Sequence, residues 1–80
     1  MPLHGSETIL VVDDDEPVRT VVTTGLKRYG YTVLSARGGK RGIECFREHR
    51  DEIDLILTDV VMPEMNGPEM VDAIWRRSPP

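Results

Sequence analysis

The chain has 80 residues, of which 39% are hydrophobic and 30% charged, and its formal net charge is −4. This composition favours one small globular domain, and no stretch approaches the ~18 apolar residues that a membrane span needs. The acidic balance argues against nucleic-acid binding by this segment, because phosphate contacts need clustered Lys and Arg. The single cysteine, Cys45, excludes an internal disulfide, which favours a cytoplasmic chain. We expect its thiol to be inert and partly buried.

Residues 1–7 form a lead-in that has neither the basic region nor the apolar run of a signal peptide. The run Thr8–Val12 is rich in Ile, Leu and Val, which predicts a strand buried on both faces. After an acidic cluster, Pro17 suits the first position of a helix that continues to a stop at Gly30. The apolar residues that recur at helical spacing in this segment are Val18, Val21, Val22, Leu26 and Tyr29.

The rest of the chain repeats this alternation. Tyr31–Ala36 predicts a second strand, and Ile53–Thr58 predicts a third, which ends at Asp59. A helical segment follows each of them, and Pro68 leads into the last one. The apolar sides of these helices carry Ile43 and Phe46, and then Met70, Val71, Ile74 and Trp75. Strands separated by helices of this length indicate an α/β fold with a parallel sheet and right-handed crossovers.

Two of the three predicted strands end in acid, the first at Asp13 and Asp14 and the third at Asp59. In an open parallel sheet, ligands bind beyond the carboxyl ends of the strands, where the direction of the connections reverses. If the third strand lies beside the first, the three carboxylates converge on one small pocket. Such carboxylates repel one another, and a hard cation with oxygen ligands, most plausibly Mg²⁺, would neutralise them. A carboxylate beside Mg²⁺ can attack phosphorus and hold the phosphoryl group as an acyl phosphate.

Acids at strand ends also occur simply as helix caps, and we favour that role for Asp15 and Glu16. The methionines near the acidic loop are expected to pack rather than to bind the cation, because thioethers are soft ligands. His4 and His49 have no second ligand at metal spacing and are interpreted as surface histidines.

Two motifs resemble the receiver domain of two-component response regulators. They are Leu10-Val11-Val12-Asp13-Asp14, and the segment from Asp54 through Asp59 and Pro63 to Gly67. The resemblance spans about residues 8–77 and implies a flavodoxin-like, doubly wound parallel sheet, with residues 8–80 as a partial receiver domain.

By this resemblance Asp59 corresponds to the phosphoacceptor and Asp14 to a direct ligand of Mg²⁺. Asp13 would act mainly through metal-bound water, and the backbone carbonyl of Val61 would supply a further metal ligand. The implied partner is a histidine kinase or a phosphotransfer protein, and the chain would be a regulatory phosphoacceptor rather than an enzyme.

The chain departs from the family in its length. Receivers have five βα units in strand order 2-1-3-4-5, and this sequence supplies three, in the expected order 2-1-3. The family's Ser or Thr on the fourth strand and its Lys on the fifth have no counterpart here. We favour a fragment of a longer protein over a natural short chain that a partner completes. The third strand, Ile53–Thr58, would then be an unprotected edge, and we expect self-association through it.

Two other functions remain open. Asp13 and Asp15 match the Asp-x-Asp pair of haloacid dehalogenase-type phosphotransferases, in which the first Asp is the nucleophile, but Pro17 stands where that family expects Thr or Val. The other alternative is a pseudo-receiver, a docking module that keeps the fold without accepting phosphate.

Overall fold

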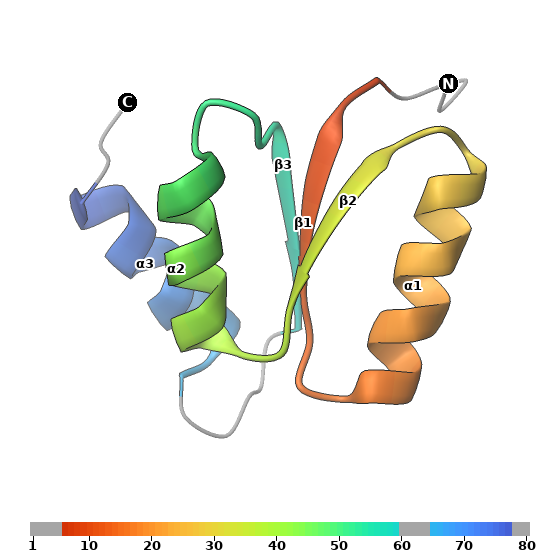
Figure 1. The fold of residues 1–80 in the computed structure, drawn as a ribbon. Helices are drawn as coiled ribbons and strands as arrows, with labels where there is room; N and C mark the ends of the chain where they lie inside the picture. The colour runs from red at the N-terminus through yellow and green to blue at the C-terminus, as the bar shows by residue number, and fades with distance from the viewer. Residues whose placement is uncertain (1–5, 60–64, 78–80) are drawn as a thin grey trace.

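The computed structural model describes residues 6–59 and 65–77, the last three of these by their backbone alone. The elements in chain order are β1 (Thr8–Val12), α1 (Glu16–Arg28), β2 (Thr32–Ala36), α2 (Gly39–His49), β3 (Leu55–Thr58) and α3 (Gly67–Arg77). The strands form one parallel sheet in the order β2-β1-β3 (Figure 1). The α/β class and the strand order 2-1-3 that the sequence predicts are therefore confirmed.

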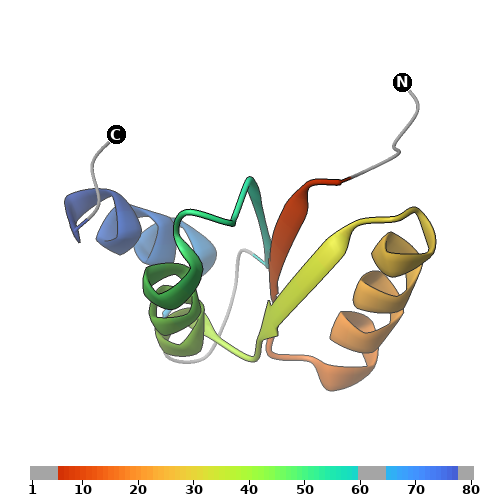
Figure 2. The same cartoon turned by 45° about the horizontal axis from the view of Figure 1, so that its top comes forward.

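The helices cover the two faces of the sheet unequally. Figures 1 and 2 show α1 alone on one face, and α2 and α3 together on the other. This is the arrangement that right-handed crossovers produce in a sheet with this strand order. The central strand β1 carries Leu10, which lies opposite Leu34 of β2 and Ile56 of β3 in the register of the sheet. Its side chain points to the face that α2 and α3 cover.

The hydrophobic core lies between the sheet and the α2/α3 layer. Its buried members are Leu10, Val12, Ala36, Met70 and Ile74. The side chains of Leu10 and Met70 are completely buried. A glycine makes this packing feasible, because a Cβ atom at Gly42 of α2 would lie 2.5 Å from the Met70 sulfur.

The face that α1 covers is packed less tightly, and here the sequence-based expectation is partly wrong. The predicted apolar stripe of α1 contains Val21 and Tyr29, which are 72% and 64% exposed, and α1 has no buried residue. Val22 and Leu26 are the two stripe residues on the partly buried side of the helix. The spacing of apolar residues was read correctly as helical, but a sheet of three strands offers α1 too little surface to bury its whole stripe.

Local hydrogen bonds explain where the elements begin and end. At the end of α1, the amide N–H groups of Gly30 and Tyr31 donate to the carbonyls of Lys27 and Leu26. This is a Schellman motif, and Gly30 has the positive φ of 93° that the motif requires. The predicted helix stop at Gly30 is confirmed. Because Tyr31 belongs to this cap, β2 begins one residue later than the predicted Tyr31–Ala36.

The third strand is also shorter than the predicted Ile53–Thr58. The amide of Ile53 donates to the carbonyl of His49, which makes Ile53 part of the turn that follows α2. The first bond to β1 comes from the amide of Asp54, and β3 itself begins at Leu55. Leu55 and Leu57 are 56% and 45% exposed on this edge strand. None of the helices in the described ranges is long and apolar enough to cross a membrane.

Candidate functional site

The acidic residues stand where the ladders of the sheet end. The amide of Asp13 donates to the carbonyl of Ala36, and the amide of Asp59 donates to the carbonyl of Val12. These two bonds extend the pairing of β1 with its neighbours by one residue on each side. The backbone positions of Asp13 and Asp59 are thus fixed by the sheet rather than by a loop, and Asp14 follows directly in the chain.

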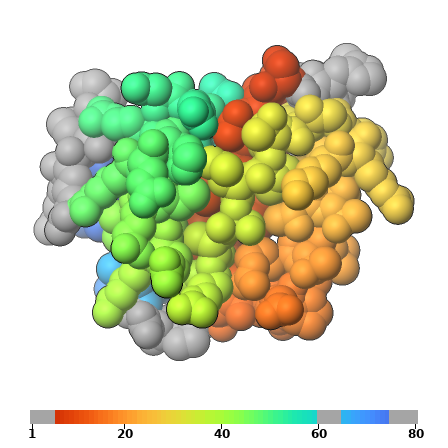
Figure 3. Space-filling model, in the orientation of Figure 1, coloured from red at the N-terminus to blue at the C-terminus, as the bar shows by residue number. Residues whose placement is uncertain are grey.

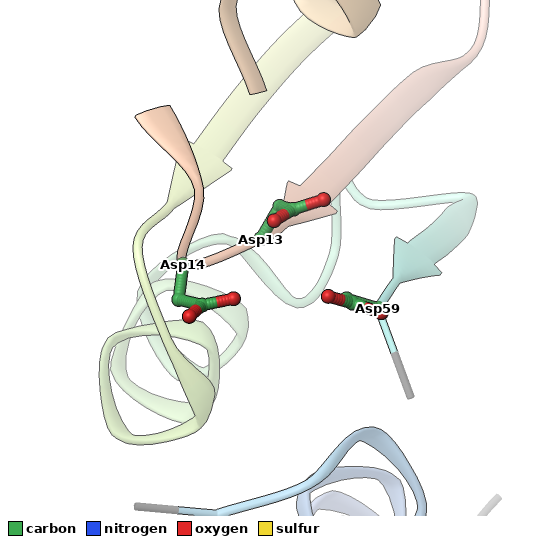
Figure 4. Close-up of side chains that lie close together, drawn as sticks. All are labelled: Asp13, Asp14 and Asp59. Atoms are coloured by element: carbon green, nitrogen blue, oxygen red, sulfur yellow. The ribbon is translucent and has the colours of Figure 1, made fainter. Parts of the chain in front are cut away.

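The three carboxylates meet, as the sequence predicts. One carboxylate oxygen from each of Asp13, Asp14 and Asp59 can be chosen so that all three lie within 4.8 Å of one another. In Figure 4 the carboxyl groups of Asp14 and Asp59 point toward one another, with Asp13 beside them. Asp14 and Asp59 are exposed and Asp13 is half-buried, so a ligand can reach the cluster from solvent.

The chemistry of this donor set fits Mg²⁺. Carboxylate oxygens are hard ligands of the kind that Mg²⁺ prefers. Asp13, Asp14 and Asp59 would together hold one such ion, because one oxygen of each lies within 4.8 Å of the others. Several coordination positions would remain for water or for oxygens of a substrate, as is usual for Mg²⁺ in proteins.

Asp15 belongs to the helix and not to the cluster. Its Oδ1 accepts a hydrogen bond of 3.2 Å from the amide of Val18, which makes it the N-cap of α1. Its own amide donates to Oδ1 of Asp13 at 2.9 Å. The capping role expected for Asp15 is confirmed. The Asp-x-Asp alternative loses support, because its second carboxylate is engaged at the helix terminus instead of facing Asp13 across a cation.

The segment after Asp59 holds both an untested expectation and a feature that the sequence interpretation missed. Val61, the predicted carbonyl ligand, lies outside the described residues. At the start of α3, the Asn66 carboxamide oxygen accepts from the amide of Glu69 at 2.8 Å, and the Glu69 carboxylate accepts from the amide of Asn66 at 3.2 Å. This reciprocal pair is a capping box. The spacing Asn-x-x-Glu is visible in the sequence and was the signal for it.

Gly67 is needed for close approach rather than for an unusual backbone conformation. Gly30, and not Gly67, is the residue with positive φ in the described part of the chain. A Cβ atom at Gly67 would lie 2.5 Å from the backbone oxygen of Asp59 and 3.1 Å from Cγ2 of Thr58. The first residue of α3 therefore packs directly against the end of β3, beside the acidic cluster.

The remaining residues singled out in the sequence have ordinary roles where the structure describes them, and His4 lies outside the described residues. Met70 is buried and Met65 packs against the core, as expected of packing residues. The imidazole of His49 lies 3.3 Å from the Glu52 carboxylate, and the expected partial burial of Cys45 is confirmed. Burial, together with the nearby Glu48 carboxylate, raises the pKa of the Cys45 thiol above its usual value. A raised pKa favours the neutral thiol, in line with the inert role expected for it.

A three-stranded parallel sheet with a carboxylate cluster beyond its carboxyl edge, at the reversal of its connections, defines the class of the protein as flavodoxin-like. The sequence profile of the family described as "Response regulator receiver domain" matches residues 9–80. The chain therefore belongs to the response regulator receiver domain family, as the two sequence motifs predict.

Individual relatives agree with this assignment. The chain is 39% identical over 77 residues to the sensor kinase CckA of Brucella abortus (strain 2308), an alignment that covers 96% of this chain and 8% of that protein. A receiver domain protein from Clostridium thermocellum has the same fold with a TM-score of 0.86, at 30% identity, over 91% of this chain and 58% of that one.

The chemotaxis protein CheY4 of Vibrio cholerae is similar with a TM-score of 0.85, at 34% identity, over 92% of this chain and 60% of its own. The chain thus spans less than two thirds of the receiver structures that it matches, and a small part of the sensor kinase.

Proposed function

We propose that this receiver domain is a phosphoacceptor of a two-component pathway, which takes a phosphoryl group onto Asp59 in the presence of Mg²⁺. The observation that carries the proposal is the convergence of three carboxylates at the ends of β1 and β3. Asp13 and Asp14 would hold the cation with Asp59, and the carbonyl of Val61 is the further ligand that the family resemblance implies. When bound, Mg²⁺ would offset the negative charge of the transferring group.

The family resemblance assigns the nucleophile to Asp59, and its surroundings support this role. It is exposed, and its carboxylate accepts no hydrogen bond from the part of the chain that the structure describes, whereas that of Asp13 accepts one from the Asp15 amide. In the transfer, a carboxylate oxygen of Asp59 forms a bond to phosphorus, while the bond from phosphorus to the donor breaks and its electron pair leaves with the donor. The product is an acyl phosphate on Asp59.

The donor in the cell would be a histidine kinase or a phosphotransfer protein of the cytoplasm, because family members act with such partners. The domain would promote only its own phosphorylation and dephosphorylation, which makes it a regulatory module and not a multiple-turnover enzyme.

The test is incubation of the chain with Mg²⁺ and acetyl phosphate, followed by intact-protein mass spectrometry and by hydroxylamine treatment, which removes acyl phosphates. We expect one phosphoryl group, which Asp59→Asn abolishes and Asp51→Asn retains. Asp51 is a matched control because it is an exposed aspartate in the turn between α2 and β3, whereas Asp59 follows the opposite end of β3.

Each other outcome contradicts the proposal in a different way. An acyl phosphate that survives Asp59→Asn but is lost in Asp13→Asn would indicate the dehalogenase-type chemistry. A folded chain that takes up no phosphoryl group would indicate a pseudo-receiver that serves for docking.

A further inference from the structure

A polar cavity lies over the free edge of β2 between α1 and α2, and it adjoins the acidic cluster through Arg19, which donates to the carbonyl of Asp13. Its volume is about 420 Å³, which falls in the range of small-molecule sites. Figure 3 views this face of the molecule, in which the atoms of β2 lie between α2 in green and α1 in orange. The lining is dominated by charged side chains, so the cavity is suited to a polar ligand rather than to a hydrophobic one.

Three arginines line this cavity. Arg19 comes from α1, Arg37 follows β2, and Arg41 lies in the first turn of α2. Because these residues are distant in sequence or on different elements, the fold and not a local motif brings them together. Like charges in one cavity repel unless an anion lies among them, and arginine is the side chain best suited to bind phosphate or carboxylate oxygens in pairs.

The arginines keep most of their donors available. Arg19 is half-buried and is held in place by one bond of 2.7 Å from its Nη1 to the carbonyl of Asp13. Arg37 makes no ion pair or hydrogen bond with residues in the described ranges. Arg41 lies 3.9 Å from the Glu44 carboxylate, but both side chains are at least 60% exposed, so this contact is weak.

Two carboxylates also belong to the lining of the cavity. Glu44 and Glu48 also line it, one and two turns of α2 beyond Arg41. The only ion-pair contact of Glu48 within the described residues is with His49, at 3.9 Å, and its side chain is 74% exposed. The lining therefore carries both cationic and anionic side chains, with Arg41 in the first turn of α2 and the two glutamates one and two turns further along the helix. A simple anion such as phosphate would interact favourably with the arginines but not with the glutamates.

We propose that this cavity binds a small ligand with two different ends. One end carries a phosphate or carboxylate group, which the three arginines bind, and the other carries hydroxyl or ammonium donors, which face Glu44 and Glu48. None of the three clustered aspartates lines this cavity, so binding to it does not require Mg²⁺. The arginine lining distinguishes it from an ordinary solvated surface, because three cations share one concave site without a matching set of short ion pairs.

The test is a titration of the ¹⁵N-labelled chain without Mg²⁺, followed by NMR, with three probes: inorganic phosphate, ribose 5-phosphate and L-glutamate. We expect shifts at the amides of Arg37 and Arg41 with a dissociation constant of about 1 mM for the better two-ended probe. Tighter binding of ribose 5-phosphate identifies phosphate with hydroxyl donors as the ligand chemistry, and tighter binding of L-glutamate identifies carboxylate with ammonium.

Three variants separate specific binding from general electrostatics. Arg37→Gln and Arg41→Gln should each weaken the better probe about tenfold, because each removes a charged hydrogen-bond donor. Arg28→Gln is the matched control, since Arg28 is an exposed arginine at the other end of α1 and should leave the affinity unchanged. All these side chains except that of Arg19 are exposed, so the substitutions leave the core intact.

Glu48→Gln should change the affinities of the different probes in opposite directions. It should weaken the binding of ribose 5-phosphate or L-glutamate severalfold, because it removes a carboxylate partner of their hydroxyl or ammonium groups. It should strengthen the binding of inorganic phosphate, because it removes a repulsive charge. No shifts with any probe up to about 10 mM, roughly ten times the expected dissociation constant, would overturn the proposal. An Arg28→Gln variant that loses as much affinity as Arg37→Gln and Arg41→Gln would also overturn it. The same holds if inorganic phosphate binds as tightly as both other probes.

Discussion

Replacement of Gly67 by alanine tests how closely β3 and α3 are fitted together. The new Cβ atom would lie 2.5 Å from the backbone oxygen of Asp59, whereas carbon and oxygen in close contact are about 3.3 Å apart. The start of α3 and the end of β3 must therefore separate by roughly 0.8 Å. Both obstacles, the Asp59 carbonyl and the Thr58 side chain, belong to the end of β3, and the carbonyl cannot rotate away as a flexible side chain could.

Overpacking of this kind costs about 1–3 kcal/mol of unfolding free energy. For a domain of 60–100 residues, each kcal/mol lowers the melting temperature by roughly 4–8 °C. We expect Gly67→Ala to unfold at a lower urea concentration and at a lower temperature, as followed by circular dichroism. The amide resonance of Asp59 should shift and the rate of its proposed phosphorylation should fall, because the group that moves is the backbone of Asp59.

Gly25→Ala is the control for the change of residue type. Nothing lies within 4 Å of a Cβ atom at Gly25, which is inside α1 and has no positive φ. Alanine there should raise the stability by up to about 1 kcal/mol, through its better helix propensity. If Gly67→Ala were as stable as the original chain and left the Asp59 resonance in place, the close fit between α3 and β3 would be refuted.

Three other predictions concern the cation site, the edge strand and the thiol. Asp14→Ala should weaken Mg²⁺ binding, measured by isothermal titration calorimetry, far more than Asp15→Ala, and equal losses would show that the ligand assignment is wrong. The chain should self-associate in sedimentation experiments at low micromolar concentration, and Leu57→Lys should reduce this association by placing a charge on the β3 edge; a monodisperse, cooperatively unfolding monomer would contradict it. Cys45 should react with iodoacetamide more slowly than a free cysteine at neutral pH, with its rate profile displaced to higher pH, because its raised pKa keeps it protonated. Glu48→Gln should move that profile back toward lower pH, and an unchanged profile would argue against the charge effect.

The features that could be predicted from the sequence depend on local patterns and on the rules for connecting parallel strands. A buried run that ends in Asp13 and Asp14, and another that ends in Asp59, are sufficient to place the carboxylates together once the strand order is known. The Schellman stop at Gly30 follows from the same kind of local signal. These predictions required no knowledge of how side chains pack.

The features that could not be predicted depend on surfaces that meet only in three dimensions. The periodicity of α1 shows that Val21 is on an apolar stripe, but its 72% exposure depends on how much sheet lies beneath the helix. The need for glycine at position 67 arises from the carbonyl of Asp59, which approaches it across the loop. Likewise, no spacing in the sequence indicates that Arg19 and Arg37 share a cavity.

The helix α1 is weakly anchored to the sheet, which affects the free energy of its local opening. Four of the five residues of β1 are buried, whereas α1 contributes no buried side chain, so α1 should open at a lower free energy than the central strand. Asp14 lies in the segment that joins these two elements, and Arg19 ties the helix to the carbonyl of Asp13. When α1 detaches, Asp14 is released while Asp59 remains fixed to β3. A cation bound between the two carboxylates would therefore couple the helix to the sheet and raise the free energy of that opening.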